Sequence, residues 1–76
     1  MLQVDLQDLS DYRLSQLISE RCSEFGTVKS IKICRVPSPF AMVEMASHQQ
    51  TYELAIRYGG SAFGSCALIH LEQEPH

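Results

Sequence analysis

Residues 27–35 read Thr-Val-Lys-Ser-Ile-Lys-Ile-Cys-Arg, and residues 40–45 read Phe-Ala-Met-Val-Glu-Met. The first stretch alternates apolar and polar side chains, the second is largely apolar, and both favour β-structure. Pro37 and Pro39 lie between them and lack the backbone donors that a continuous strand needs. We therefore expect two strands, 27–35 and 40–45, joined by a tight connection.

A helix is predicted on the N-terminal side of these strands. Ser10 is a good N-cap residue, Asp11 suits the first turn, and Gly26 supplies a C-terminal stop. Between them the apolar residues fall at helical spacing: Leu14, Leu17, Ile18, Cys22 and Phe25.

A second helix is predicted on the C-terminal side, opened by the polar residues 47–50 and ended by Gly59 and Gly60. Its apolar face carries Thr51, Leu54, Ala55 and Tyr58. Outside the two helices, residues 2–6 alternate in the manner of a short strand, and residues 67–71 form an apolar one.

The order βαββαβ predicts an α+β fold, the ferredoxin-like sandwich, in which two helices cover one face of a four-stranded antiparallel sheet. Alternation assigns one set of strand residues to the helix side: Val4, Ile31, Ile33, Ala41, Val43, Ile69 and Leu71. The other set then lies on an open face: Gln3, Asp5, Lys32, Cys34, Phe40, Met42, Glu44 and His70. We expect one domain, 1–72, and a flexible tail, 73–76.

Composition restricts the function classes. The chain has 76 residues, 45% of them hydrophobic, with six Lys or Arg against nine Asp or Glu and a net charge of −3. So small a core favours a shallow binding surface over an enclosed site. Three widely spaced cysteines suggest free thiols, and the first residues lack the basic segment of a signal peptide, so we expect a cytoplasmic protein without a membrane span.

Catalytic and metal-binding patterns are missing from the sequence. There is no G-x-S-x-G, H-E-x-x-H or phosphate-binding glycine loop, and the histidines His48, His70 and His76 lack metal-ligand spacing. We therefore predict no enzyme activity, no catalytic residue, no metal and no cofactor.

Three parts of the sequence together match a known family: Phe-Gly-Thr-Val at 25–28, Ile31 with Ile33, and Pro-Phe-Ala-Met-Val-Glu-Met at 39–45. On these residues the chain resembles the RNA recognition motif family, and the resemblance covers nearly the whole length. The family's octamer, [K/R]-G-[F/Y]-[G/A]-[F/Y]-V-x-[F/Y], aligns to residues 38–45. Phe40, Ala41 and Val43 match it.

Other positions depart from the family pattern. Ser38 replaces the basic residue, Pro39 the glycine, Met42 a stacking aromatic and Met45 a core aromatic. On the first strand, the usual aromatic of the family's hexamer falls at Gln3, and Leu6-Gln7 replaces its Asn-Leu ending. The resemblance thus implies the fold more strongly than it implies the stacking site.

The resemblance implies weak binding of single-stranded RNA on the open sheet face. Bases would stack on Phe40, since aromatic side chains on this face are the family's stacking platforms. The other candidate RNA-binding residues are Met42, Lys32, Gln3, His70, Asp5 and Arg35.

Two alternatives stay open. The domain could instead be a protein-interaction or homodimerisation module that has lost RNA binding. Family members that bind peptides usually have an acidic first helix and an Arg-x-Phe element; the element aligns here at residues 61–63, where Phe63 is kept and the arginine is lost. Dimer contacts would then involve the apolar residues Phe40, Met42 and Leu68. An amino-acid-sensing ACT-type domain shares the element order, but residues 7–10 lack the glycine-rich turn usual in that family.

Overall fold

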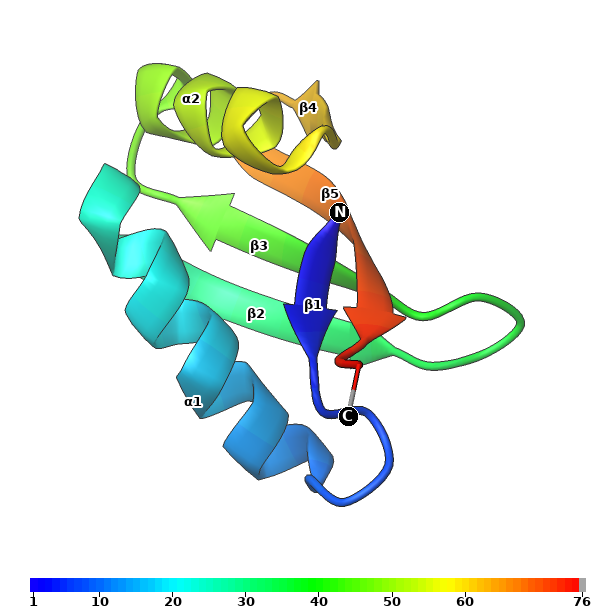
Figure 1. Cartoon of the computed structure of the whole chain (residues 1–76). Helices are drawn as coiled ribbons and strands as arrows, with labels where there is room; N and C mark the ends of the chain where they lie inside the picture. Colours follow the sequence, from blue (N-terminus) through cyan, green and yellow to red (C-terminus); the bar gives the residue numbers. More distant parts are fainter. Residues whose placement is uncertain (76) are drawn as a thin grey trace.

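The computed structural model describes residues 1–75 and has an α+β fold (Figure 1). Its elements, in chain order, are β1 (Leu2–Val4), α1 (Asp11–Cys22), the 3₁₀ turn η1 (Ser23–Phe25), β2 (Val28–Cys34), β3 (Phe40–Met45), α2 (His48–Tyr58), β4 (Ser61–Phe63) and β5 (Cys66–Gln73). The α+β class and every predicted helix and strand are confirmed. The strand β4 was not predicted.

Strand β5 lies in the middle of the sheet. It pairs antiparallel with β3, from Phe40↔His70 to Glu44↔Cys66, and β3 pairs antiparallel with β2. On its other side β5 pairs first with β4, antiparallel, and then with β1, which runs parallel to it. The two short strands β4 and β1 therefore follow one another along the same side of β5.

This strand order differs from the expected four-stranded antiparallel sheet. The expected order would place the N-terminal strand beside β3, but β5 occupies that position. The physical reason is length: β5 has 8 residues and β1 has 3, so β5 can satisfy many more of the backbone groups of β3. Strand β1 pairs only with the end of β5, through Leu2↔Leu71, Gln3↔Glu72 and Val4↔Gln73.

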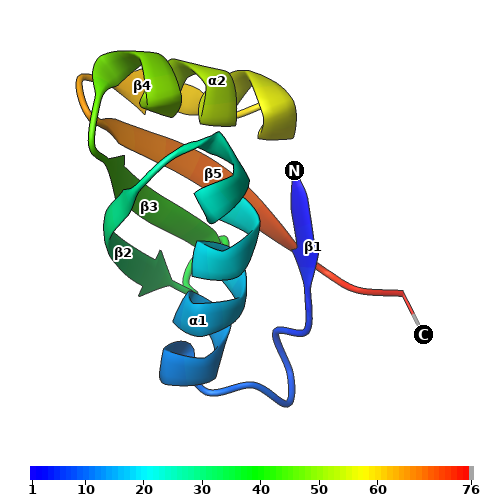
Figure 2. The same cartoon turned by 90° about the vertical axis from the view of Figure 1, so that its left-hand side faces the viewer.

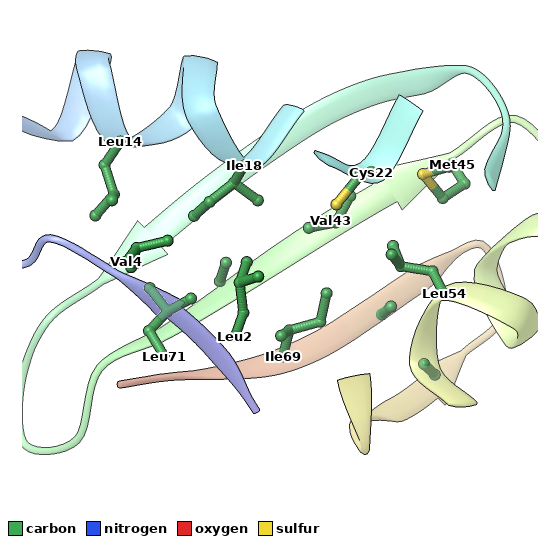
Figure 3. Packing of buried hydrophobic residues seen from close by; sticks show 13 residues of the cluster. Leu2, Val4, Leu14, Ile18, Cys22, Val43, Met45, Leu54, Ile69 and Leu71 are labelled. Atoms are coloured by element: carbon green, nitrogen blue, oxygen red, sulfur yellow. The ribbon is translucent and has the colours of Figure 1, made fainter. Parts of the chain in front are cut away.

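Both helices cover the same face of the sheet (Figure 2). Helix α1 contributes Leu14, Ile18 and Cys22 to the core, and α2 contributes Thr51, Leu54 and Ala55 (Figure 3). The strands contribute every second residue: Leu2, Val4, Ala41, Val43, Met45, Ala67, Ile69 and Leu71. The predicted helix-facing set is confirmed, with Ile31 and Ile33 partly buried at its margin.

The helix ends follow the sequence signals. Ser10 Oγ accepts a hydrogen bond from Arg13 N at 3.3 Å, and Ser47 Oγ accepts one from Gln50 N at 3.2 Å. Helix α1 ends at Cys22 and passes through η1 before it reaches Gly26. Gly59 ends α2 with φ 67°, the left-handed conformation in which glycine has no steric penalty.

The C-terminal segment is tied to the domain as far as Glu74. Strand β5 extends to Gln73, and the backbone N–H of Glu74 donates to Val4 O at 3.0 Å. The predicted tail 73–76 thus begins inside a strand, and His76 lies outside the described residues. Within residues 1–75, no helix is long and apolar enough to cross a membrane.

Candidate nucleic-acid interface

The face of the sheet opposite the helices carries three rows of side chains, which we call the open face. Each row crosses the sheet from β2, because residues paired in register point to the same side. The first row is Cys34, Phe40 and His70; the second is Lys32, Met42, Leu68 and Ser61; the third is Ser30, Glu44, Cys66 and Phe63.

Phe40 and His70 are direct neighbours in the first row. They are register partners on β3 and β5, and opposed side chains in an antiparallel pair have Cβ atoms about 4.5–5.5 Å apart. Phe40 is partly exposed and His70 is exposed. Two ring side chains therefore lie on neighbouring strands at one end of the β3–β5 ladder, and His70 faces outward as predicted.

Lys32 and Met42 are register partners in the adjacent row, and Leu68 follows on β5. Lys32 is exposed, whereas Met42 and Leu68 are partly buried. The row thus places one ammonium group beside a flat apolar surface, one residue pair away from the two rings.

The acidic groups on this face limit what it can bind. Glu44 lies in the third row and accepts a hydrogen bond from Ser30 Oγ at 3.1 Å, and Glu72 lies beyond His70 on β5. Lys32 is the basic side chain that the described strands place here, so the face has no excess of positive charge. A phosphate backbone would find one cation and two carboxylates.

Gln3 does not join this group. It lies on β1, paired with Glu72, and β5 separates it from Phe40. Its side chain is exposed, and its backbone carbonyl oxygen accepts a hydrogen bond from Arg21 Nη1 at 3.3 Å. The expected neighbour of Phe40 on the adjoining strand is thus replaced by His70.

Asp5 has a structural role in the turn after β1. Its Oδ1 accepts hydrogen bonds from Gln7 N and Asp8 N, both at 3.1 Å, and from Gln73 Nε2 at 3.4 Å. The carboxylate is oriented toward its own turn, a common use of aspartate in loops. The structure does not bring it to the open face.

Arg35 also serves the fold. Its Nη1 donates to Leu6 O at 2.6 Å, its Nη2 to Leu9 O at 2.8 Å, and its Nε to Asp11 Oδ1 at 2.7 Å. Two of these nitrogens bond to the loop between β1 and α1, and the third bonds to the first residue of α1. The guanidinium is therefore turned away from Phe40, which it was predicted to assist.

Two further apolar residues lie on the open face, although they were not among the predicted RNA-binding residues. Leu68 lies in the centre of the face beside Met42, and Phe63 lies at its edge with 59% of its surface exposed. The sequence carried a signal for the strand that places Phe63: Gly64-Ser65 is a two-residue hairpin turn, and Gly64 has φ 64°.

The three cysteines are free thiols. Cys22 is buried in the core, and burial raises the pKa of its thiol to about 11. Cys34 and Cys66 are partly exposed on the open face, and Cys34 Sγ donates to Val36 O at 3.3 Å. Among residues 1–75, no three His, Cys, Asp or Glu side chains gather in a way that could hold a metal ion.

Comparisons with family models, curated proteins and solved structures found no match to this chain.

Proposed function

We propose that the open face binds a short single-stranded RNA segment, with two bases stacked on Phe40 and His70. The observation that supports this most directly is the adjacency of these two rings on the central strands β3 and β5. Flat rings accept any base, because every base has a π-face. Lys32 would contact one phosphate, and Met42 and Leu68 would contact the sugar and base edges.

The strand directions support a relationship to the ferredoxin-like sheet of RNA recognition motifs. In the order β4-β5-β3-β2, each strand is antiparallel to its neighbour, and β4 follows α2 in the chain. The sheet as a whole differs from the ferredoxin-like one, because β5 lies beside β3 where the N-terminal strand would lie, and β1 runs parallel to β5. Under this proposal β5 takes the position of the family's hexamer strand, and His70 supplies the ring that Gln3 lacks.

The contacts set a modest affinity. Stacking contributes about 1–3 kcal/mol per base, so two stacked bases contribute about 2–6 kcal/mol. Because a dissociation constant of 1 mM corresponds to about 4 kcal/mol, we expect a dissociation constant of about 1 mM, with limits of roughly tens of millimolar and tens of micromolar. A single phosphate contact predicts a shallow salt dependence, with a slope of about −0.7 in log K against log salt for a single strand.

The test is a titration of ¹⁵N-labelled protein with a randomised pool of short RNAs at low salt. We expect amide shifts at Lys32, Phe40, Met42, Leu68 and His70. Phe40→Ala and His70→Ala should each weaken binding about fivefold to a hundredfold, from the stacking energy above.

The matched control is Tyr52→Ala, which removes a ring of α2 that is 61% exposed and lies on the helix side. Its binding should equal that of the unmodified protein. Absence of shifts at millimolar RNA, or equal losses in the control and in Phe40→Ala, would rule the proposal out. A circular dichroism spectrum of each variant separates lost binding from lost folding.

A second candidate function is homodimerisation through the same face. Met42, Leu68 and the exposed ring of Phe63 form an apolar surface across β3, β5 and β4. Apolar patches of this kind often mark protein contacts. Sedimentation velocity at millimolar protein distinguishes the two: a strict monomer excludes the dimer, and a dimer broken by Leu68→Glu would replace the RNA proposal.

A further inference from the structure

A groove lies at the opposite edge of the molecule, between α1 and β2. It has a volume of about 790 Å³. Its floor is apolar and partly buried: Leu9, Leu17, Val28 and Ile31. On the α1 side the groove is lined by two small residues, Ser15 and Ser19. Tyr12, which is 71% exposed, lines the rim of the groove, and we call it the lip. The Tyr12 hydroxyl accepts a hydrogen bond from Gln16 Nε2 at 3.2 Å, which steadies that lip.

The strand that borders this groove presents backbone groups to it. Within residues 1–75, β2 pairs with β3 alone. Met45 N donates to Ser65 O on the β5 side, and Ala46 N donates to Thr27 O on the β2 side. The alternation of an antiparallel ladder then makes Ser30, Lys32 and Cys34 the residues bonded to β3. The backbone groups of Ile31 and Ile33 therefore point outward along the edge.

A strand added beside Ile31 and Ile33 would place every second side chain in the groove. Residues opposed across a ladder share a face, and the side chains of Ile31 and Ile33 point to the α1 side. The added strand would gain main-chain hydrogen bonds from β2 and apolar contact with the groove floor. This is the mode by which several peptide-recognition domains extend a sheet.

The charges around the groove favour a particular partner. Two basic side chains, Arg13 and Lys29, line it together with one acid, Glu20. The groove is therefore locally positive on a chain whose net charge is −3. Pairing β2 with the β2 of a second copy would bring four lysines onto one ribbon, which disfavours self-association.

We propose that this groove binds an extended acidic peptide segment of another protein by strand addition to β2. The segment has apolar side chains at alternate positions, opposite Ile31 and Ile33, and at least one carboxylate that reaches Lys29 and Arg13. This surface is separate from the open face, so it adds a second binding activity to the proposed function.

The first experiment is selection of phage-displayed random dodecapeptides on the full chain, with counter-selection on the Lys29→Glu variant. The most enriched peptide is then synthesised and titrated into ¹⁵N-labelled protein. We expect a carboxylate and alternating apolar residues in the enriched peptides, and amide shifts along 28–33 and along the outer face of α1.

Two substitutions test the contacts. Lys29→Glu should weaken binding of the synthetic peptide about tenfold, the effect of replacing an attractive charge pair by a repulsive one. Arg57→Glu makes the same charge change on α2, away from the groove, and should leave the dissociation constant unchanged.

N-methylation of alternate peptide amides tests strand addition itself. In an added strand, every second peptide amide would face β2. Methylating these amides should weaken binding at least about tenfold, because it removes main-chain hydrogen bonds. Methylating the alternate amides, which face away from β2, should have little effect. Equal losses of affinity for the two sets of amides would overturn strand addition.

Other results would also overturn the proposal: no enrichment over an unrelated protein, enrichment of basic peptides, or shifts confined to the open face or to β4. A dimer that pairs through β2 in sedimentation would make a second copy the occupant. Phe40→Ala separates the two proposals, since it should weaken RNA binding about fivefold to a hundredfold and leave peptide affinity unchanged.

Discussion

Arg35→Ala should destabilise the domain and leave the open face intact. The guanidinium makes three hydrogen bonds, at 2.6, 2.8 and 2.7 Å, to Leu6 O, Leu9 O and Asp11 Oδ1. They connect the end of β2 to the loop that joins β1 to α1. Removing the side chain leaves two backbone carbonyl groups without their donor.

The magnitude follows from these contacts and from exposure. A hydrogen bond that involves a charged group contributes about 1.5–3 kcal/mol, and a surface ion pair less than about 1 kcal/mol. The side chain of Arg35 is 33% exposed and that of Asp11 67%, so water replaces part of what is lost. We therefore expect a loss of about 2–3 kcal/mol, which lowers Tm by roughly 10–20 °C in a domain of this size.

Urea denaturation of the unmodified protein and of Arg35→Ala measures this loss. Arg35→Lys is the matched comparison, since it keeps the charge and one donor and should recover part of the stability. Asp11→Ala removes the most exposed partner and should cost less than 1 kcal/mol, about the value of a surface pair. A loss below about 0.5 kcal/mol for Arg35→Ala, in a folded protein that no longer binds RNA, would refute the structural role and restore the predicted contact with RNA.

Three further outcomes are expected. Gly60→Ala should lower the free energy of unfolding, measured by urea denaturation, by about 1–3 kcal/mol, because the new Cβ would clash with the Leu68 carbonyl oxygen. Gly64 has open space around it and φ 64°, so Gly64→Ala should lower it by about 1–2 kcal/mol from backbone strain alone. Ser47→Ala should lower stability by about 1 kcal/mol through loss of the α2 cap, as thermal unfolding would show. Burial raises the pKa of the Cys22 thiol from 9.0 to about 11, so the unfolded chain loses this proton at lower pH than the folded chain does. The free energy of unfolding should therefore fall by about 2–3 kcal/mol as the pH rises from 9 to 11. In Cys22→Ala this part of the pH dependence should vanish.

Local features of the fold were predictable because they depend on neighbours in sequence. The alternation of residues 40–45 assigned Ala41 and Val43 to the core and Phe40 and Met42 to the other face, as the structure has them. Side-chain caps and a left-handed glycine define the helix ends within one turn. Alternation also oriented His70, since Ile69 and Leu71 on either side of it are buried.

The partners of each strand were not predictable in the same way. Alternation tells which face a residue occupies, but it says nothing about which strand lies beside it. Gln3 and Val4 point to opposite faces of the sheet, as their alternation predicts. Their strand β1 nevertheless lies at the edge of the sheet, because β5 offers β3 a longer ladder. For the same reason the hydrogen bonds of Arg35 were not predictable, since its three acceptors lie 24 to 29 residues away in sequence.

The basic residues are dispersed over the described surface. They occupy four kinds of environment. Arg21 and Arg35 donate to backbone carbonyl groups, and Arg13 and Lys29 line the groove. Lys32 lies on the open face, and Arg57 is on α2. No surface of the described chain gathers enough cations to hold a phosphate backbone by charge. A nucleic acid on the open face must therefore be held mainly by the rings of Phe40 and His70, while the two cations of the groove suffice for one or two carboxylates of a peptide. The same scarcity of charge thus favours stacking on one surface and strand addition on the other.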